Sequence, residues 1–408
     1  MDSNHPMPEL VAGVRDEGTL SACSQYADAV YFSVDRLSLR CRAKTITVDN
    51  LSDFVQSVRE KGLKAYLVVN SVIYPEDTSD LSAILNAARG AKVDAIVAWD
   101  PAVILKASSM GLDIHISTQA NVSNAKTAEF YGSLGASRII LSRELSLDQI
   151  KQIRQHTDIE LEVFVHGAMC QAISGRCYLS AYLLGKSGNC GQCTQPCRWE
   201  WTLNADDGSQ VQVGGKYLLS ARDLCMIEHL PQLVEAGIDA FKIEGRLRDS
   251  RYISTVSRCY SEALETCRDG KFENDRVPEW KQQLRAVYNR GFSTGFYFGN
   301  PSREGFIVEK DMNASQTLKE LIGEVVNYYQ NQGAAYVKLT DSALSIGDTI
   351  LIEGENTHLE QDVSSMQVAG NNIKSAEKGM DVGLAVNCRV RPNDKVFRIT
   401  DPDRSGSE

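Results

Sequence analysis

Residues 61–100, KGLKAYLVVNSVIYPEDTSDLSAILNAARGAKVDAIVAWD, contain the unit that decides the fold of this chain. A Lys-Gly turn leads into the apolar run 65–70, and a second apolar run occupies residues 95–99. Between them, residues 81–88 carry apolar side chains three and four positions apart, which is the spacing of an amphipathic helix. The stretch therefore predicts a strand, a helix and a second strand, the repeating unit of a parallel sheet.

The same unit recurs along the first two-thirds of the chain. Helical patterns cover residues 51–59, 124–131 and 147–155, and Ser146 offers an N-cap side chain to the last of them. Strands that alternate with helices in this number favour a (β/α)8 TIM-like barrel. The alternative is an open doubly wound sheet, but no Gly-x-Gly-x-x-Gly turn follows any strand. The eight predicted strands are residues 8–12, 29–33, 65–70, 95–99, 114–118, 138–142, 161–165 and 240–244.

One long insertion interrupts this regular spacing, between the seventh and the eighth predicted strands. It occupies about residues 167–224 and contains the pattern Cys170-x6-Cys177-x15-Cys193-x3-Cys197 among glycines and small polar residues. In a TIM barrel the loops that follow the strands build the active face. We therefore expect the cysteines to lie where chemistry is done.

Four thiols in one glycine-rich loop suit a tetrahedral sulfur-liganded centre. The gaps between them are wider than the close Cys-x2-Cys pairs of zinc ribbons, which favours an iron–sulfur cluster over a structural zinc. Buried, inert thiols are the third alternative. Cys190 and Cys225 lie close in sequence, and either could replace a ligand.

Polar residues at the ends of the predicted strands are expected at the same face as the cysteines. His166 could donate a proton or pack in the core, and Arg143 follows the sixth strand. Glu244 and Arg246 could bind an anionic substrate or pair with each other. These four are the candidate catalytic residues, and the full set of strand-end residues is Asn70, Asp100, Gln119, Arg143, Glu144, His166, Glu244 and Arg246.

Composition limits the class of protein. The chain has 408 residues, 43% of them hydrophobic and 24% charged, as in ordinary globular proteins, and its net charge is −10. We expect no membrane partner, because no apolar run approaches the roughly 20 residues that span a bilayer. The N-terminus lacks the pattern of a secretory signal, and 11 cysteines favour a reducing, cytoplasmic location. The region 170–258 is nearly balanced in charge and could bind a polyanion locally.

The last quarter of the chain has a different pattern. After helical patterns at 251–266 and 277–290, a glycine-rich aromatic stretch at 291–301 forms a joint. Short alternating runs at 323–329, 334–339, 348–353 and 382–391 then predict a small all-β domain, expected to be a barrel. We place the barrel domain at residues 1–300 and the C-terminal β-barrel domain at residues 301–408.

Several segments resemble one known family. Residues 162–170, EVFVHGAMC, and 174–180, SGRCYLS, closely resemble the motif of the collagenase-like proteins, classified as peptidase family thirty-two of unknown catalytic type. Residues 191–199, GQCTQPCRW, and 241–246, FKIEGR, are similar to two further family segments. The resemblance covers roughly residues 8–300.

The family includes prephenate-dependent hydroxylases of the tRNA wobble uridine, ribosomal-RNA cytidine hydroxylases and accessory proteins of ubiquinone hydroxylation. The resemblance implies a [4Fe–4S] cluster held by Cys170, Cys177, Cys193 and Cys197. It also implies tRNA as a partner, prephenate as a candidate small-molecule oxygen donor, and a paralogous family member as a candidate partner.

Three functions follow as hypotheses. The first is an iron–sulfur-dependent RNA hydroxylase that modifies position 5 of the tRNA wobble uridine. The second is a collagenase-like peptidase, although no Gly-x-Ser-x-Gly elbow or His-Glu-x-x-His pair offers a hydrolytic mechanism. The third is a non-catalytic iron–sulfur accessory protein.

Overall fold

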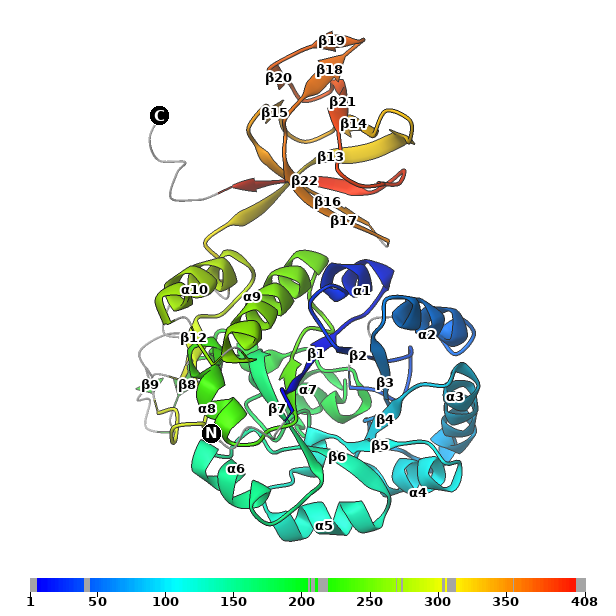
Figure 1. Ribbon diagram of the computed structural model, residues 1–408, viewed down its shortest axis with the longest axis vertical. Coiled ribbons are helices and arrows are strands. Elements are labelled where there is room, and N and C mark those ends of the chain that lie inside the picture. The colour runs from blue at the N-terminus through cyan, green and yellow to red at the C-terminus, as the bar shows by residue number, and fades with distance from the viewer. Residues whose placement is uncertain are drawn as a thin grey trace.

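Eight parallel strands close into a barrel in the N-terminal part of the chain (Figure 1). The computed structural model describes residues 6–39, 45–204, 206, 210–211, 219–268, 270–272, 274–302, 305–306, 313–354 and 356–400. Each strand pairs with the next along the chain, and β11 closes the ring by pairing with both β7 and β1. The predicted TIM-like barrel is therefore confirmed. Its strands are β1 (Glu9–Gly13), β2 (Ala29–Phe32), β3 (Lys64–Val68), β4 (Ala95–Ala98), β5 (Ile114–Ile116), β6 (Ala136–Ile140), β7 (Glu160–Gly167) and β11 (Ala240–Ile243).

Helices surround the barrel and bury one face each against it (Figure 1). The sequence marks their starts with polar caps. At α6, for example, the Ser146 hydroxyl accepts from the Gln149 backbone while the Gln149 side chain accepts from the Ser146 backbone, a capping box. The helices are α1 (Glu17–Cys23), α2 (Leu51–Glu60), α3 (Thr78–Ala91), α4 (Pro101–Ser109), α5 (Ala125–Ser133), α6 (Leu147–Arg154), α8 (Leu230–Glu235), α9 (Ser250–Arg268) and α10 (Val277–Ala286).

The cysteine-rich insertion follows β7, as predicted. It leaves the barrel at Gly167 and returns through β10, which pairs antiparallel with the end of β7. The Arg176 guanidinium donates to the Gln119 carbonyl at 3.4 Å, and the Val72 amide donates to the Asn189 carbonyl at 3.1 Å. These bonds hold the insertion against the carboxyl ends of the barrel strands. Its elements are α7 (Leu179–Leu184), β8 (Leu203–Asn204), β9 (Gln210–Val211) and β10 (Asp223–Cys225), and β12 (Phe292–Ser293) pairs with β10.

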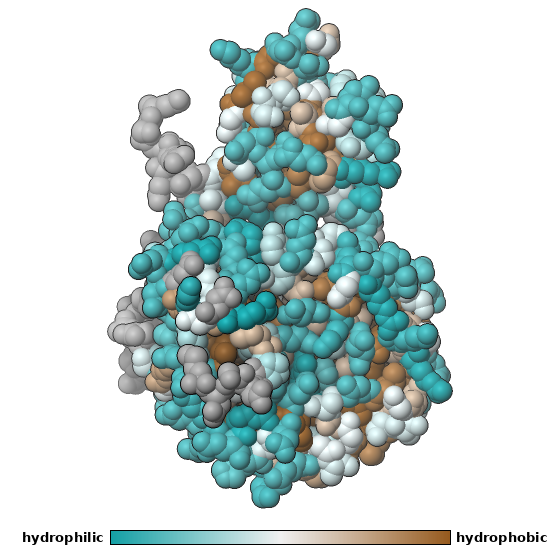
Figure 2. All heavy atoms as spheres, viewed as in Figure 1, coloured by the Kyte–Doolittle hydropathy of each residue, from teal (hydrophilic) through white to brown (hydrophobic). Residues whose placement is uncertain are grey.

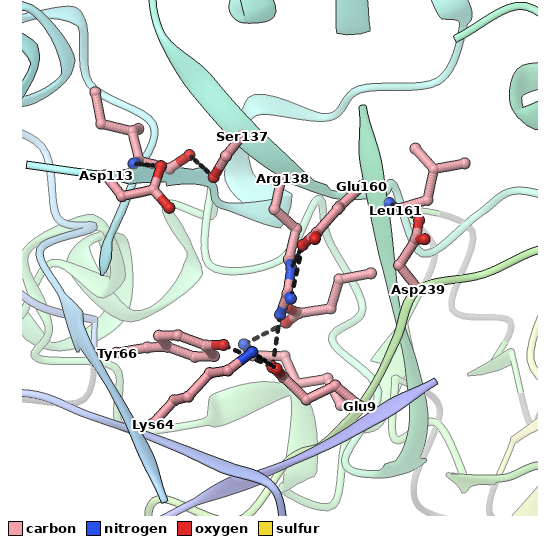
Figure 3. Close-up of polar contacts among 12 residues, drawn as sticks. Glu9, Lys64, Tyr66, Asp113, Ser137, Arg138, Glu160, Leu161 and Asp239 are labelled. Carbon is pink, nitrogen blue, oxygen red and sulfur yellow. Dashed lines mark hydrogen bonds and ion pairs between the residues drawn. The ribbon is translucent and has the colours of Figure 1, made fainter. Parts of the chain in front are cut away.

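Charged side chains occupy the barrel interior (Figure 3). The buried Arg138 lies 2.9 Å from Glu9 and 2.7 Å from Glu160. Glu162 accepts from Lys242 at 2.5 Å and lies 3.3 Å from Arg138. Buried charges persist only when opposite charges and hydrogen bonds compensate them, and this network meets that condition.

The C-terminal part is an antiparallel all-β region, as predicted. Its strands bury alternate side chains, such as Ala335, Val337 and Leu339 of β14, in a separate core. The main sheet has the order β17-β16-β22-β13-β14-β21-β18-β19. The strands are β13 (Leu318–Tyr329), β14 (Ala334–Leu339), β15 (Leu344–Ser345), β16 (Thr349–Gly354), β17 (Thr357–Asp362), β18 (Met366–Val368), β19 (Asn371–Asn372), β20 (Ser375–Ala376), β21 (Asp381–Ala385) and β22 (Lys395–Thr400).

The two parts meet where α1, α9 and α10 face the C-terminal sheet (Figure 1). Arg251 on α9 forms an ion pair of 2.9 Å with Glu360 on β17. The face in Figure 2 is mostly hydrophilic, and its apolar residues form small separate areas over both parts. None of the helices among the described residues is long and apolar enough to cross a membrane.

Candidate functional site at the carboxyl end of the barrel

A cavity of about 110 Å³ lies between the ends of the barrel strands and the insertion. Its inner wall includes buried apolar side chains from the ends of the strands, such as Val68, Val97 and Phe164. Its outer wall comes from the insertion and includes Met169 and Gly188. The polar and cysteine residues of its lining are Tyr31, Asn70, Ser117, Thr118, Gln119, Arg143, Cys170, Ser174, Cys193, Gln195, Cys197, Arg198, Lys242, Glu244 and Arg246.

The structure brings three of the four predicted cysteines to the wall of this cavity and places the fourth nearby. Cys170, Cys193 and Cys197 line it. Cys177 lies beside them, because a methyl group on Gly188 would stand 3.4 Å from the Cys177 carbonyl and 3.6 Å from Cys193 Cβ. Burial raises the pKa of the Cys197 thiol; the charge of Arg198 lowers it, and the nearby thiols of the other three cysteines raise it further.

Cys190 and Cys225, the alternative ligands, lie elsewhere. The Cys190 thiol donates to the Tyr74 hydroxyl at 3.6 Å. Cys225 is buried on β10, with its sulfur 3.9 Å from the Tyr260 hydroxyl. Neither belongs to the described lining of the cavity. The thiols of Cys170, Cys177 and Cys193, in contrast, lie close enough to Cys197 to raise its pKa, so these four could jointly hold a sulfur-liganded group.

Arg143 reaches the cavity with part of its hydrogen-bonding capacity unused. Its Nη1 donates to the Ala168 carbonyl at 2.8 Å, and its guanidinium carbon lies 4.5 Å from the centre of the Phe164 ring. Its Nε and Nη2 atoms are buried and have no hydrogen-bond partner among the described residues. Burial lowers the pKa of Arg143, and the charges of Glu244 and Cys170 oppose this shift. The guanidinium can therefore donate to an anionic group in the cavity.

Glu244 and Arg246 extend from the end of β11 beside Tyr31. The Tyr31 hydroxyl donates to the Ile243 carbonyl at 3.0 Å and lies 3.4 Å from Glu244 Oε2. Arg246 donates to the Ser38 hydroxyl at 3.0 Å, and its guanidinium carbon lies 5.3 Å from the centre of the Tyr31 ring. These contacts fix both side chains in the cavity wall.

Three of the predicted strand-end residues lie outside the described lining. His166 is buried among Tyr252, Tyr260 and Phe292, and its Nδ1 stands 3.3 Å from the Tyr260 hydroxyl. Burial, with the charge of Arg248, lowers its pKa to about 3. His166 is therefore a neutral imidazole near neutral pH, and its catalytic role stays a prediction.

The other two strand-end residues outside the lining are Asp100 and Glu144. The Asp100 carboxylate accepts from the Ala102 backbone at 2.9 Å and so caps α4. Glu144 is exposed and lies 3.4 Å from the Asn121 side-chain amide. Asn70 and Gln119, in contrast, line the cavity and are joined by a 3.1 Å hydrogen bond.

Sequence reasoning missed two charged residues of the lining. Lys242 stands two positions before Glu244, and the two-residue period of a strand puts both side chains on the inner face of β11. That signal was present in the sequence. Arg198 is buried and donates to the Ser220 hydroxyl at 3.0 Å and to the Met169 carbonyl, which ties the two ends of the insertion together. No local pattern marks it, because both partners are distant in sequence.

The fold and the site together define a TIM-like barrel with a cysteine-lined cavity beneath an insertion after its seventh strand. Peptidase family U32 matches residues 17–306 of this sequence, and the chain belongs to that family. The resemblance found in the motifs is thereby confirmed.

Relatives in this family carry different functional names. An uncharacterised protease of Methanocaldococcus jannaschii is 42% identical over 96% of this chain and 98% of its own length. A collagenase of Porphyromonas gingivalis is 35% identical over 96% of this chain and 97% of its own. The tRNA hydroxylation protein P1 of Bacillus subtilis is 33% identical over 79% of this chain and 78% of its own. The family thus includes proteins named for RNA hydroxylation and proteins named for proteolysis.

Proposed function

We propose that this protein is an iron–sulfur-dependent RNA hydroxylase that acts at position 5 of the tRNA wobble uridine. The observation that carries the proposal is that Cys170, Cys193 and Cys197 line one cavity at the carboxyl end of the barrel strands, with Cys177 close to Cys197. The relative named tRNA hydroxylation protein P1 supports RNA as the substrate class. By family resemblance, prephenate is the proposed oxygen donor, and a paralogous family member is a proposed partner.

A [4Fe–4S] cluster is the group that fits these donors best. Four cysteine thiolates are its usual ligand set. A single zinc ion needs its ligands at about 2.0–2.3 Å from one point, and the described residues contain no group of three His, Cys, Asp or Glu side chains placed to hold one metal ion. Three of the cysteines line a cavity and the fourth lies near it, an arrangement that supports a larger inorganic group. When bound, such a cluster would supply electron transfer at the cavity.

The protein's own residues would orient and enclose the reactants. Arg143 would donate its free Nε–H and Nη2–H groups to an anionic oxygen donor. Glu244 could accept a proton at its carboxylate while the Tyr31 hydroxyl fixes its position. The insertion would exclude water, which strengthens these interactions. The target base would leave the anticodon loop at low cost, because that loop is single-stranded.

Nucleoside analysis of total tRNA tests the proposal. We expect 5-hydroxylated uridine derivatives in a strain that carries the gene and their loss in a strain that lacks it. Mass spectrometry of digested tRNA measures this difference. Identical nucleosides in the two strains, together with an iron-free protein after anaerobic reconstitution, would refute the proposal.

The ligand assignment has a matched test within the insertion. Cys193→Ala should lower the iron and sulfide content of the reconstituted protein sharply, because Cys193 lines the cavity. Cys190→Ala, three positions away, should leave both unchanged, because its thiol faces Tyr74. Cys170→Ala, Cys177→Ala and Cys197→Ala should behave like the first variant. Equal iron in all five proteins would contradict the assignment.

Peptidase activity is the second candidate, because a collagenase is 35% identical over almost the whole chain. The described lining of the cavity contains serine, threonine and cysteine but no histidine to activate them. We therefore expect no cleavage of denatured collagen by the iron-loaded protein. The Arg143→Gln variant distinguishes a catalytic role from a non-catalytic accessory role. If this variant retains its iron but the hydroxylated nucleoside is lost, the accessory role is excluded.

A further inference from the structure

Two tyrosines at the insertion helix are the most exposed large apolar side chains described in this structure. Tyr178 is 79% exposed and Tyr182 is 87% exposed. The Tyr182 amide donates to the Tyr178 carbonyl at 2.8 Å, so the two residues are one helical turn apart and share a face of α7. Exposed apolar side chains that adjoin one another form a patch, and such patches are candidates for binding surfaces.

The platform that carries these rings is fixed to the rest of the insertion. Ser180, between the two tyrosines, is buried, and its hydroxyl accepts from the Thr194 backbone at 2.8 Å. The Thr194 hydroxyl lies 2.6 Å from the same oxygen. The helix is thus tied to the segment between Cys193 and Cys197, and both of these cysteines line the cavity.

The charge of the insertion indicates what this face binds. Residues 163–199 contain no Asp or Glu, although the whole chain has 53 of them and a net charge of −10. The same stretch contains Arg176, Lys186 and Arg198. A protein that is acidic overall therefore presents exposed aromatic rings within a stretch, residues 163–199, that carries no carboxylate. This combination of exposed aromatic rings and few negative charges suits a single-stranded nucleic acid, whose backbone is negatively charged and whose bases can stack on the rings.

A second cavity, of about 310 Å³, adjoins the platform through Thr194 and the cysteine cavity through Cys193 and Glu244. Arg248 and Arg290 line it, with their guanidinium carbons 3.9 and 5.1 Å from the centre of the Tyr288 ring.

One carboxylate, Asp223, serves both arginines, at 3.3 Å from Arg290 and 4.0 Å from Arg248. Arg290 is buried, and its Nε has no hydrogen-bond partner among the described residues. Glu244, on the shared wall, is close enough to Arg143 for its charge to raise the pKa of that guanidinium. Donors of this kind suit a phosphate oxygen.

We propose that the face of α7 and the cavity of Arg248 and Arg290 form one binding surface for a single-stranded segment of RNA. Tyr178 and Tyr182 stack on its bases, and the two arginines hold a phosphate of its backbone. A strand held in this way places a neighbouring base at the cysteine cavity. The inference rests on the proposed function, because it names how the substrate of that site is bound.

Binding to an RNA hairpin with a single-stranded loop tests the aromatic half of the surface. Loss of stacking on two rings should raise the Kd of the iron-loaded Tyr178→Ala/Tyr182→Ala protein at least about 10-fold. Phenylalanine at both positions should restore binding, because it keeps the rings. Tyr329→Ala, an exposed tyrosine on β13, should have no effect. Iron content, measured in every variant, should not change.

Salt dependence tests the arginine half. Arg290→Gln should lower the slope of log K against log salt concentration by about one, because one phosphate contact is lost. Arg258→Gln, on α9 and outside the lining of both cavities, is the control and should keep the slope. A thermal melt of each variant checks that it is folded. Inorganic phosphate serves as the competitor. If the cavity binds only free phosphate, Arg290→Gln should lose phosphate binding and keep hairpin binding.

Unchanged hairpin affinity in the double tyrosine variant would overturn the inference. So would loss of self-association in that variant with RNA binding intact, because the face would then be a protein interface. The result is separable from the proposed function. Hairpin binding through the tyrosines without any difference in tRNA nucleosides would refute the function alone, and hydroxylated tRNA with unchanged affinity would refute the inference alone.

Discussion

At the scale of single residues, the buried His166 at the end of β7 makes the stability of the protein depend on pH. Its pKa is about 3 in the folded protein because of burial and the charge of Arg248, whereas an unfolded histidine titrates near 6.5. Between these values the unfolded state binds the extra proton, so the free energy of unfolding falls as the pH drops from 6.5 toward 3.

The His166→Phe variant should reduce this pH dependence by up to about 1.4 kcal/mol per pH unit. Urea unfolding at pH 5 and at pH 7 measures the effect. His156→Gln, on an exposed helix end, is the control and should keep the wild-type dependence. An unchanged pH dependence in His166→Phe would show that His166 is not held neutral.

Gly167 is the residue that lets the insertion leave the barrel. Its φ of +103° lies in a region that side chains rarely adopt, and a Cβ there would stand 2.7 Å from the Glu244 carbonyl oxygen. Gly167→Ala should therefore cost about 1–3 kcal/mol and lower iron retention, because Cys170 follows three residues later. Gly90→Ala on α3, where nothing lies within 4 Å, should instead stabilise by up to about 1 kcal/mol. Equal stability of the two variants would contradict this account.

At the scale of elements, the barrel strands were predictable because buried parallel strands are continuous apolar runs. A (β/α)8 barrel implies a helix after each strand, but the sequence patterns gave no ranges for helices α1 and α4. Helix α1 has only seven residues, too few for a clear helical pattern. Asp100, the N-cap of α4, directly follows a predicted strand, and a functional residue at a strand end would stand in the same place. The predicted strand at 382–391 ends at Ala385, because the chain then turns and the Asn387 amide donates to the Gln361 side chain.

The candidate site, too, was predictable only in part. The cysteines are close in sequence, and their spacing alone indicates a common centre. Residues such as Tyr31 and Arg198 reach the cavity only through contacts between distant segments, which a single sequence does not display.

The role of Asp100 as a cap yields a prediction for α4. Asp100→Ala should lower the free energy of unfolding by about 1 kcal/mol, because the Ala102 amide loses its acceptor. Asp100→Asn keeps an acceptor oxygen and should stay close to the wild type. Denaturant unfolding measures both variants. A loss of tRNA hydroxylation in Asp100→Ala without a loss of stability would instead make Asp100 a residue of the site.

At the scale of the whole molecule, Arg251 joins four segments of the two parts. From α9 it reaches Glu360 of β17 at 2.9 Å, the Ala286 carbonyl at the end of α10 at 3.1 Å and the Thr317 hydroxyl, just before β13, at 2.9 Å. Hydrogen bonds that involve a charged group contribute about 1.5–3 kcal/mol each where they are shielded from water. This one side chain therefore couples the unfolding of the C-terminal sheet to that of the barrel.

Arg251→Met keeps the apolar stem and removes the three contacts, so the C-terminal sheet should unfold at a lower temperature than the barrel, in a separate calorimetric transition. Arg258→Met is the matched control, because Arg258 lies two turns further along α9 and contacts only Glu262 of its own helix among the ion pairs described. An exposed pair of that kind contributes at most about 1 kcal/mol, and the control should keep the wild-type profile. A single unshifted transition in Arg251→Met would mean that packing between α1 and β17, rather than this guanidinium, holds the two parts together.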